Sequence, residues 1–400
     1  MKIGLISNFP VGPRYNGGAM TVWGLYKAYK EKGFDVSLIL LCEENIDKEL
    51  FENCKNFLDL NVVKHEIVFF QNKRKFFFIK IKSLITSLIF KTPEYFFYEQ
   101  LNLNEKIKNI LKNKKFDKII CYHFDALSSC YLSNYKIVCF MGDLMHEPRN
   151  ARRIIFKNSF FLKLINEIEK FISIRVTINL LSKFKNIGFC ANHYKELIEK
   201  KIWNTKYFRV PLVKPDQIVE YNNYNNVNTI LLIGDLTGTV TISSIFYLKK
   251  FLNFTNNEIK QYFKFKIFGS GKIIDEFKNL KDYKCVEFKG VNHNLKNEFK
   301  NSSILLVSND ITVGIRVRII TAMSYGLIVL THSSNLNGIP ELEHNKNVLV
   351  FNSVKELEDL FLGIKNSRFD LNKISKEALL TFNKYFYYKE AVEDLEKKLN

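Results

Sequence analysis

Two arginines, Arg316 and Arg318, stand where an apolar strand gives way to the expected start of a helix, just beyond Gly314. A helix N-terminus favours anions, because its backbone N–H groups point outward and the helix dipole is positive at that end. The free amides around Gly314 and Ile315, together with two guanidinium groups, would form a binding site for a diphosphate. The sequence leaves open the alternative that both arginines pair with Asp310 or lie in solvent.

A second group of candidates follows predicted strands in the first half of the chain. His123 follows a strand predicted over residues 118–122, and Asp143 follows one predicted over residues 136–141. Parallel strands place such positions at one carboxyl edge of a sheet, where ligands bind. An imidazole there could bind substrate hydroxyls or orient an acceptor, and Asp143 could bind hydroxyls or act as a base. A structural histidine and a solvated aspartate are the alternatives.

The elements that must position these residues form two α/β halves. Residues 2–42 predict a strand, a glycine-containing loop, a helix and a strand, which is the opening unit of a doubly wound parallel sheet. The pattern restarts at residue 229, after an asparagine-rich run over residues 221–226 that indicates a linker. We therefore predict two Rossmann-like domains facing across a cleft, residues 1–213 and 214–400, with the C-terminal helix packing back on the first.

Periodicity predicts most of the remaining elements. Further strands are predicted over residues 61–70, 118–122, 136–141, 186–191, 207–211, 263–268, 285–290, 303–308 and 327–331. Helices are predicted over residues 19–32, 243–252, 316–325, 354–365 and 371–399.

Composition narrows the class of partner. The formal net charge of +19 indicates an acidic partner, although richness in Lys, Asn, Ile and Phe, as an AT-rich genome imposes, explains part of it. Nucleic-acid binding would rest on charge alone, so we expect no nucleic-acid partner.

The seven cysteines show no C-x-x-C spacing, and several lie in apolar runs. They indicate buried thiols in a reducing compartment rather than a metal site or disulfides.

The segment from Val313 to Leu349 resembles the donor-binding signature of glycosyltransferase family 4. The family motif E-A-M-A-x-G-x-P-V is matched in frame by Thr321-Ala322-Met323-Ser324-Tyr325-Gly326-Leu327-Ile328-Val329. The G-x-P-E-hydrophobic turn of the family resembles Gly338-Ile339-Pro340-Glu341-Leu342. Members with G-x-R-x-K before the helix are similar to Gly314-Ile315-Arg316-Val317-Arg318.

The resemblance extends to the other strand ends. The first strand, followed by Gly17 and Gly18, is similar to the family's glycine loop, which approaches the donor phosphates; a tight turn before the helix is the alternative. Gly234 and Gly269 end strands that resemble those beside the donor nucleotide. His123 resembles the family's histidine near the reacting sugar.

Two departures from the family concern charge. The two glutamates that the family carries eight positions apart are replaced by Val313 and Thr321. The second glutamate holds the donor ribose in the family, whereas Thr321 could donate or accept one hydrogen bond. Asp235 stands where many members place an arginine for phosphate.

The resemblance implies a GT-B fold and a hexosyltransferase-type activity. The enzyme would move a sugar from a nucleotide sugar to a growing cell-envelope glycan, such as lipopolysaccharide or capsule, with retention of configuration. The nucleotide sugar is the co-substrate, no further cofactor is implied, and no Asp-x-Asp is placed to hold a metal. The acceptor would be a glycan or a lipid-linked glycan.

Two other classes of protein are compatible with parts of the sequence. The lost glutamates favour a catalytically degenerate GT-B scaffold that binds a glycan or a partner enzyme. Glu43 and Glu44 follow the second strand, as in a dinucleotide-dependent oxidoreductase, but the first loop lacks G-x-G-x-x-G.

The sequence predicts a cytoplasmic protein. The chain opens directly with a strand, and its longest apolar stretch, residues 76–90, contains Lys80 and Lys82. Basic and aromatic runs over residues 73–97 and 149–163 indicate peripheral contact with the anionic cytoplasmic face of the inner membrane. An ordinary core-facing helix stays open as the alternative for residues 73–97.

Overall fold

The computed structural model describes residues 1–7, 17–43, 65–70, 101–123, 137–141, 160–202, 206–209, 213–214, 227–272, 274–291 and 295–399, with single residues at 89, 126, 144, 147 and 151. The predicted linker over residues 221–226 lies outside these ranges, as do Asp143 and nearly all of the basic and aromatic runs over residues 73–97 and 149–163.

The chain divides into two compact units. The first comprises Met1–Asn150, Lys157–Pro215 and Tyr388–Asn400, and the second comprises Ala151–Phe156 and Asp216–Tyr387. The end of the chain therefore belongs to the first unit, whereas the helices that precede it belong to the second.

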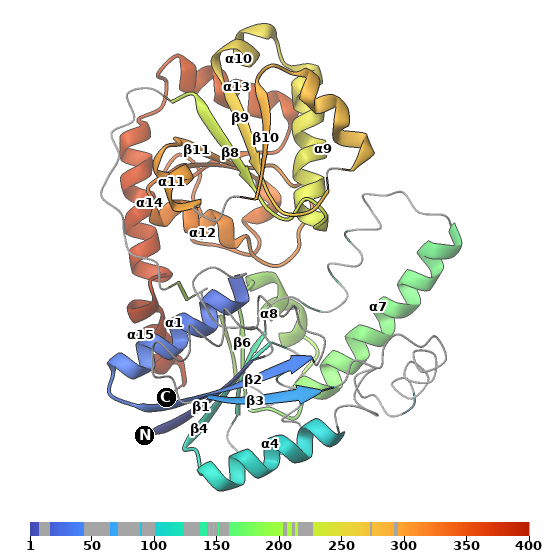
Figure 1. Ribbon diagram of the computed structural model, residues 1–400, viewed down its shortest axis with the longest axis vertical. Coiled ribbons are helices and arrows are strands. Elements are labelled where there is room, and N and C mark those ends of the chain that lie inside the picture. Colours follow the sequence, from blue (N-terminus) through green and yellow to red (C-terminus); the bar gives the residue numbers. More distant parts are fainter. Residues whose placement is uncertain are drawn as a thin grey trace. The chain divides into compact units, whose positions relative to one another are not determined.

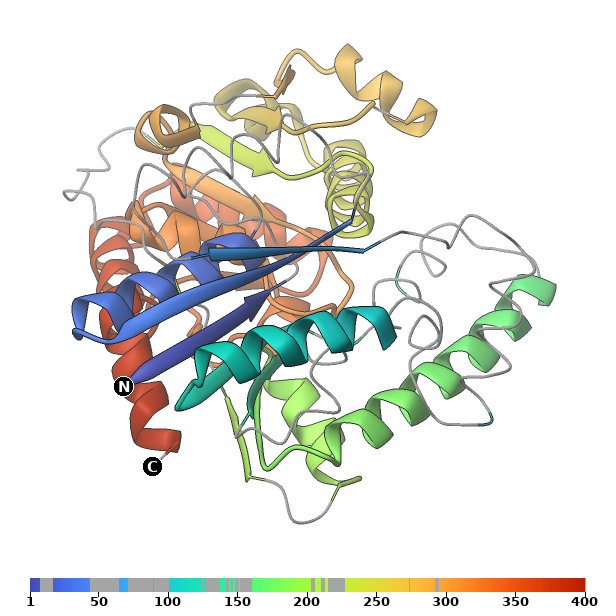
Figure 2. The ribbon, with the colours of Figure 1, turned by 60° about the horizontal axis from the view of Figure 1, so that its bottom comes forward.

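A seven-stranded parallel sheet forms the first unit, in the order β3-β2-β1-β4-β5-β6-β7 (Figure 1). The apolar runs of β1, β2, β4 and β6 are buried, as in sheets covered on both faces. Its strands are β1 (Lys2–Ser7), β2 (Asp35–Glu43), β3 (His65–Phe70), β4 (Lys118–Tyr122), β5 (Ile137–Met141), β6 (Asn186–Phe189) and β7 (Lys206–Arg209). Its helices are α1 (Gly17–Glu31), α4 (Leu101–Lys114), α7 (Phe160–Leu181), α8 (Asn192–Glu199) and α15 (Tyr388–Leu399). Figure 2 shows α4 alongside the sheet and α7 extending away from it.

A six-stranded parallel sheet forms the second unit, in the order β10-β9-β8-β11-β12-β13 (Figure 1). Its strands are β8 (Thr229–Ile233), β9 (Lys264–Phe268), β10 (Val286–Gly290), β11 (Ile304–Val307), β12 (Ile328–His332) and β13 (Leu349–Phe351). Helix α9 packs against α13, and α12 packs against α14. The α-helices are α9 (Thr239–Phe254), α10 (Asn257–Tyr262), α11 (Leu295–Lys300), α12 (Val317–Ser324), α13 (Val354–Lys365) and α14 (Leu371–Tyr385), and the 3-10 helices are η3 (Asp275–Asp282) and η4 (Ser333–Asn335).

A group of aromatic side chains lies within the core of the second unit. Phe251, Phe263 and Phe265 surround Phe361, with ring centroids 4.8–5.8 Å from it. All four side chains are buried, and such pairs add to the free energy of area burial. The packing holds α9 and α13 on the sheet and so places the start of α9 at the carboxyl edge.

The helical region predicted over residues 371–399 is interrupted at Phe386 and Tyr387, between α14 and α15. Phe386 and Tyr388 are both buried, and the backbone N–H of Tyr388 donates to the carbonyl of Lys214 at 3.1 Å. The Tyr388 hydroxyl donates to Glu31 in α1, at 2.7 Å from the nearer oxygen. Helix α15 therefore packs beside α1 in the first unit (Figure 1).

Candidate functional site

The carboxyl edge of the second sheet contains its topological switch point. Strands β8 and β11 are neighbours at the centre of the sheet, and the order runs outward from them in opposite directions. Open parallel sheets bind ligands at such a point. Gly234 directly follows β8, and the β11–α12 loop, which we define as residues 308–316, follows β11. The candidate arginines therefore lie at the edge where a ligand is expected.

Arg318 lies in the first turn of α12. Its guanidinium donates to the Thr241 hydroxyl of α9, at 3.4 Å from Nη2 to Oγ1. The side chain retains some exposed surface, yet burial, followed by the charge of Arg316, lowers the pKa of Arg318 to about 9. The group still stays protonated at neutral pH. Among the described residues no carboxylate pairs with it, so this positive charge is held by a neutral partner.

Arg316 is the N-cap residue of α12, with φ −92° and ψ 92°, and its charge acts on Arg318. The alternative that Arg318 pairs with Asp310 is wrong in this structure. Asp310 Oδ1 instead accepts a hydrogen bond from Ser243 Oγ at 2.8 Å. Like charges held together at a helix start raise the local potential, which favours an anion there.

Gly314 lies in the β11–α12 loop with a positive φ of 54°, a conformation that glycine adopts without strain. Gly338 packs directly against it. A β-carbon at position 338 would lie 2.6 Å from the Gly314 carbonyl oxygen and 2.8 Å from Ile315 Cγ2. The segment that resembles the family's G-x-P-E turn thus supports the back of the predicted phosphate loop.

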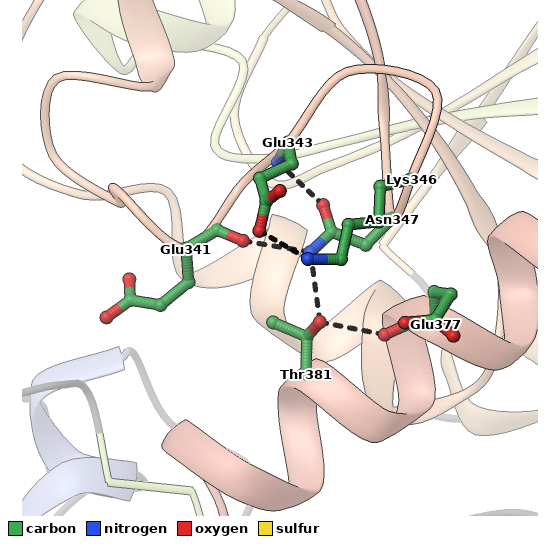
Figure 3. A network of polar contacts seen from close by, with 6 residues as sticks. All are labelled: Glu341, Glu343, Lys346, Asn347, Glu377 and Thr381. Atoms are coloured by element: carbon green, nitrogen blue, oxygen red, sulfur yellow. Dashed lines mark hydrogen bonds and ion pairs between the residues drawn. The ribbon is translucent and has the colours of Figure 1, made fainter.

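A buried amide anchors that supporting segment to α14 (Figure 3). Asn347 Nδ2 donates to the Glu341 carbonyl at 2.8 Å and to Thr381 Oγ1 at 2.9 Å, and its Oδ1 accepts from the Glu343 backbone at 2.8 Å. Thr381 in turn donates to the Glu377 carbonyl at 2.8 Å. Each hydrogen-bonding group of this side chain is satisfied, so the chain from Glu341 to Asn347 has a defined position.

The other glycines predicted to bind the donor lie either in strand-end loops or at the start of a helix. Gly234 and Gly269 lie in adjacent strand-end loops, where Gly234 N–H donates to the Phe268 carbonyl at 3.0 Å and Gly269 N–H to the Gly290 carbonyl at 2.9 Å. Gly17 and Gly18 were predicted in a loop before a helix at Ala19, but they are the first residues of α1. Their amides therefore belong to a helix start, where backbone N–H groups lack intrahelical partners.

Thr321 cannot serve as a hydrogen-bond donor to a ribose as arranged here. Its hydroxyl donates to the Val317 carbonyl one turn earlier, at 3.0 Å, which leaves only acceptor capacity. Val313, at the other lost glutamate position, is 5% exposed. Asp235 Oδ1 accepts from the backbone and the hydroxyl of Thr237, at 3.0 and 2.8 Å, so this carboxylate stabilises its own loop.

His123 directly follows β4 at the switch point of the first sheet, where β1 and β4 are neighbours. Its φ of +76° is left-handed, which is uncommon for a residue with a β-carbon. Strained residues of this kind concentrate at functional sites. His123 therefore stays a candidate, whereas Asp143 lies outside the described residues.

Sequence reasoning missed Thr241, which accepts a hydrogen bond from Arg318, and Ser243, which bonds to Asp310. Thr241 and Ser243 lie in the first turns of α9, which the structure begins at Thr239, before the predicted start at Ser243. Gly238 and the hydroxyl residues after it could have indicated the start of this helix. The predicted start was later because the apolar periodicity begins only at Ile242. No sequence pattern indicated that Asn347 would connect the segment after Gly338 to α14.

Comparison with known proteins concerns the fold and the second unit, not the individual site residues. The sequence model of the family "Glycosyl transferases group 1" matches residues 228–364, from β8 to the penultimate residue of α13. No curated protein sequence matches the chain. The second unit thus contains a glycosyltransferase group 1 domain, which includes Gly234, Thr241 and both arginines.

Solved structures of glycosyltransferases share the fold over the whole chain. A glycosyltransferase from Rickettsia africae ESF-5 has a TM-score of 0.62 at 15% identity, covering 99% of this chain and 97% of its own. HepE of Anabaena, solved with UDP and glucose, has a TM-score of 0.63 at 12% identity, covering 100% and 99%. A TarM mutant of S. aureus, in complex with fondaparinux, alpha-GlcNAc-glycerol and UDP, has a TM-score of 0.66 at 11% identity, covering 100% and 99%.

These findings confirm the predicted GT-B fold with two Rossmann-like sheets and the predicted resemblance to a glycosyltransferase. The enzyme class is that of a glycosyltransferase. In the part of the chain that the structure describes, no helix is long and apolar enough to cross a membrane.

Proposed function

We propose that the second unit binds the diphosphate of a nucleotide sugar at Arg316, Arg318 and the amides around Gly314, and that the enzyme transfers the sugar to a cell-envelope glycan. The observation that supports the site is the Arg318 guanidinium, which lies at the switch point with a hydroxyl as its partner and with no carboxylate from the described residues. A buried cation without a counter-ion is costly, and a diphosphate would supply the missing charge.

The chemistry follows from that placement. Loss of the nucleoside diphosphate leaves negative charge on the phosphate that was joined to the sugar. Two guanidinium groups and backbone N–H groups aimed at that phosphate stabilise the charge as it develops, which lowers the barrier. This proposal needs no metal, because the guanidinium groups and the backbone amides supply the positive charge at the leaving phosphate.

The acceptor and the stereochemical outcome are also proposals. The TarM mutant structure contains alpha-GlcNAc-glycerol, and HepE was solved with UDP-glucose, so glycans and UDP-linked sugars are the first substrates to try. We propose that His123 of the first unit contacts the reacting sugar or the acceptor and that the glycosidic bond keeps the anomeric configuration of the donor. NMR of the product anomer and assays with excess EDTA test retention and metal independence.

The decisive test compares Arg316→Ala and Arg318→Ala with Arg368→Ala, an exposed arginine of the same unit whose guanidinium contacts the Asp359 carbonyl. Binding of UDP, GDP and dTDP is measured by calorimetry, and transfer is measured from the corresponding nucleotide sugars. We expect losses of about 100-fold or more for Arg318→Ala, from two lost charge-assisted hydrogen bonds, and no loss for Arg368→Ala. Unimpaired binding and turnover in both site variants would refute the site.

A catalytically degenerate GT-B scaffold is the second candidate function. It is favoured by the apolar Val313 and by the engaged hydroxyl of Thr321, because neither side chain can replace a family glutamate. A nucleoside diphosphate that binds, without hydrolysis or transfer from any nucleotide sugar, would support the scaffold over the enzyme.

We also propose that the protein contacts a membrane surface peripherally. On α7, Ile168 and Phe171 are 51% and 59% exposed, with Lys170 and Arg175 beside them. Apolar and basic side chains together favour an anionic bilayer surface. Co-sedimentation with anionic but not neutral vesicles tests the contact, and Phe171→Ser is expected to weaken it.

A further inference from the structure

The first turns of α9 hold both ends of the β11–α12 loop. Ser243 Oγ donates to Asp310 Oδ1 at 2.8 Å and accepts from the Asp310 backbone N–H at 3.3 Å, near the start of the loop. Thr241 Oγ1 accepts from Arg318 just beyond its end, at 3.4 Å. Both hydroxyl side chains are buried, so α9 is a common support for the two ends of the loop.

The partner of Arg318 is unusual for a buried guanidinium. Buried arginines normally pair with carboxylates, often through two hydrogen bonds that neutralise the charge. A threonine hydroxyl accepts one of the five N–H groups and leaves the charge in place. In the described part of the chain, Arg318 makes no other hydrogen bond to a side chain or carbonyl.

Gly234 explains how the guanidinium fits there. A β-carbon at position 234 would lie 2.8 Å from each terminal nitrogen of Arg318, and it would also collide with Thr241 Oγ1. The absence of a side chain at the end of β8 therefore lets the guanidinium pack against backbone. Gly234 leaves room for the Arg318 guanidinium, and the hydrogen bond to Thr241 fixes its orientation.

We propose that Thr241 is a positioning residue that orients the Arg318 guanidinium toward the donor diphosphate without neutralising it. This inference rests on the proposed donor site. Thr241 acts through Arg318 and does not touch the ligand, so its removal changes the aim of the guanidinium rather than its charge.

The experiment measures calorimetric affinity for UDP, with GDP and dTDP in parallel, and kcat and KM for the nucleotide sugar that is used. Thr241→Val keeps the shape of the side chain and removes the hydroxyl, whereas Thr241→Ser keeps the hydroxyl. We expect Thr241→Val to weaken nucleoside-diphosphate affinity and kcat/KM by about tenfold, the effect of one hydrogen bond to a charged group. Thr241→Ser should restore most of both.

Ser244→Ala is the matched control. Ser244 lies on the same helix and is equally buried, and its hydroxyl has no hydrogen-bond partner among the described residues. We expect Ser244→Ala to leave affinity and turnover unchanged. A loss of activity in Thr241→Val that Ser244→Ala shares, or that Thr241→Ser does not rescue, would overturn the positioning role.

A double-mutant cycle separates this inference from the proposed function. If Thr241 acts through Arg318, Thr241→Val adds no further loss of affinity to Arg318→Ala. Additive losses would contradict that mechanism. If Arg318→Ala weakens binding and Thr241→Val does not, only the positioning role fails. If Arg318→Ala has no effect, or no nucleoside diphosphate binds, the proposed site fails and the inference fails with it.

Discussion

The two units each contain a partly buried cation near the core, and their partners differ. In the first unit Lys118 donates to both oxygens of Glu396, at 3.0 and 2.8 Å, and the Tyr29 hydroxyl donates to the same carboxylate at 2.5 Å. Burial, followed by the charge of Glu396, raises the pKa of Tyr29 well above its ordinary value. In the second unit Arg318 has the hydroxyl of Thr241 and no carboxylate among the described residues.

The difference separates a structural cation from a functional one. Lys118, Glu396 and Tyr29 form a neutralised cluster that holds α15 against the first sheet, and nothing in it requires a ligand. Arg318 keeps its charge in a place where burial opposes the charged form. Such an arrangement lowers the stability of the folded chain unless an anion binds, which is the usual cost of a functional site.

Replacing Arg318 by methionine should give the largest effect. We expect nucleoside-diphosphate affinity to fall about 100-fold or more, while the melting temperature of the ligand-free protein stays the same or rises, because a buried charge is removed. Calorimetry and thermal unfolding measure the two quantities. A large fall in melting temperature together with unchanged affinity would show that Arg318 is structural and would break the comparison.

The opposite pattern is expected at Lys118. Lys118→Met leaves Glu396 partly buried without its cation, and we expect a destabilisation of about 1–3 kcal/mol, below the value for a fully buried pair because both side chains are partly exposed. Denaturant unfolding measures the loss, and Lys32→Met is a matched control at an exposed lysine. Nucleoside-diphosphate affinity should be unchanged, and a parallel loss of affinity would contradict the distinction between the two cations.

The pH dependence of Arg318 gives a third way to sharpen the comparison. The ligand-free pKa of about 9 lies well below the ordinary value of an arginine, so the charge needed for diphosphate binding is lost as pH rises through 9. Affinity should then fall about tenfold per pH unit. The unfolded chain binds the extra proton between the two pKa values, so this group makes folding more favourable as pH rises across that window.

Carbon-13 NMR of the arginine Cζ in the ligand-free protein measures that titration directly. Arg316→Met should move the midpoint upward, because the neighbouring charge of Arg316 is a cause of the lowered pKa. An Arg318 signal that does not titrate up to pH 11 would show that the guanidinium is better solvated than its packing indicates.

The smallest effect is expected at Thr321. Thr321→Ala removes a hydroxyl whose hydrogen is already donated to Val317, so nucleoside-diphosphate affinity should change by less than about twofold. Thr321→Glu introduces a family-like carboxylate close to the arginines. Its effect on the ratio of UDP to dTDP affinity reports whether this position contacts the ribose, and a large loss in Thr321→Ala would refute the hydrogen-bond assignment.

Most strands could be predicted because a buried parallel strand is a short apolar run bounded by polar residues. The prediction for β4 matches its observed bounds, and most of the others differ by one or two residues at an end. The short elements β13, α10 and α11 were missed, since three to six residues carry too little periodicity. The break between α14 and α15 was missed because neither Phe386 nor Tyr387 is a helix-breaking residue. The helix is interrupted there because Phe386 is buried in the second unit and Tyr388 in the first.

The sequence by itself determined the two α/β repeats, the glycosyltransferase resemblance and the place of Arg316 and Arg318 at a helix start, because each depends on residues close together in the chain. Only the tertiary structure decided what surrounds those residues. Thr241 lies 77 positions before Arg318, and Glu396 lies 278 positions after Lys118. The order of the strands within each sheet and the packing of the last helix decide whether a cation lies beside a hydroxyl or beside a carboxylate. Neither the strand order nor the helix packing can be predicted from a local sequence pattern.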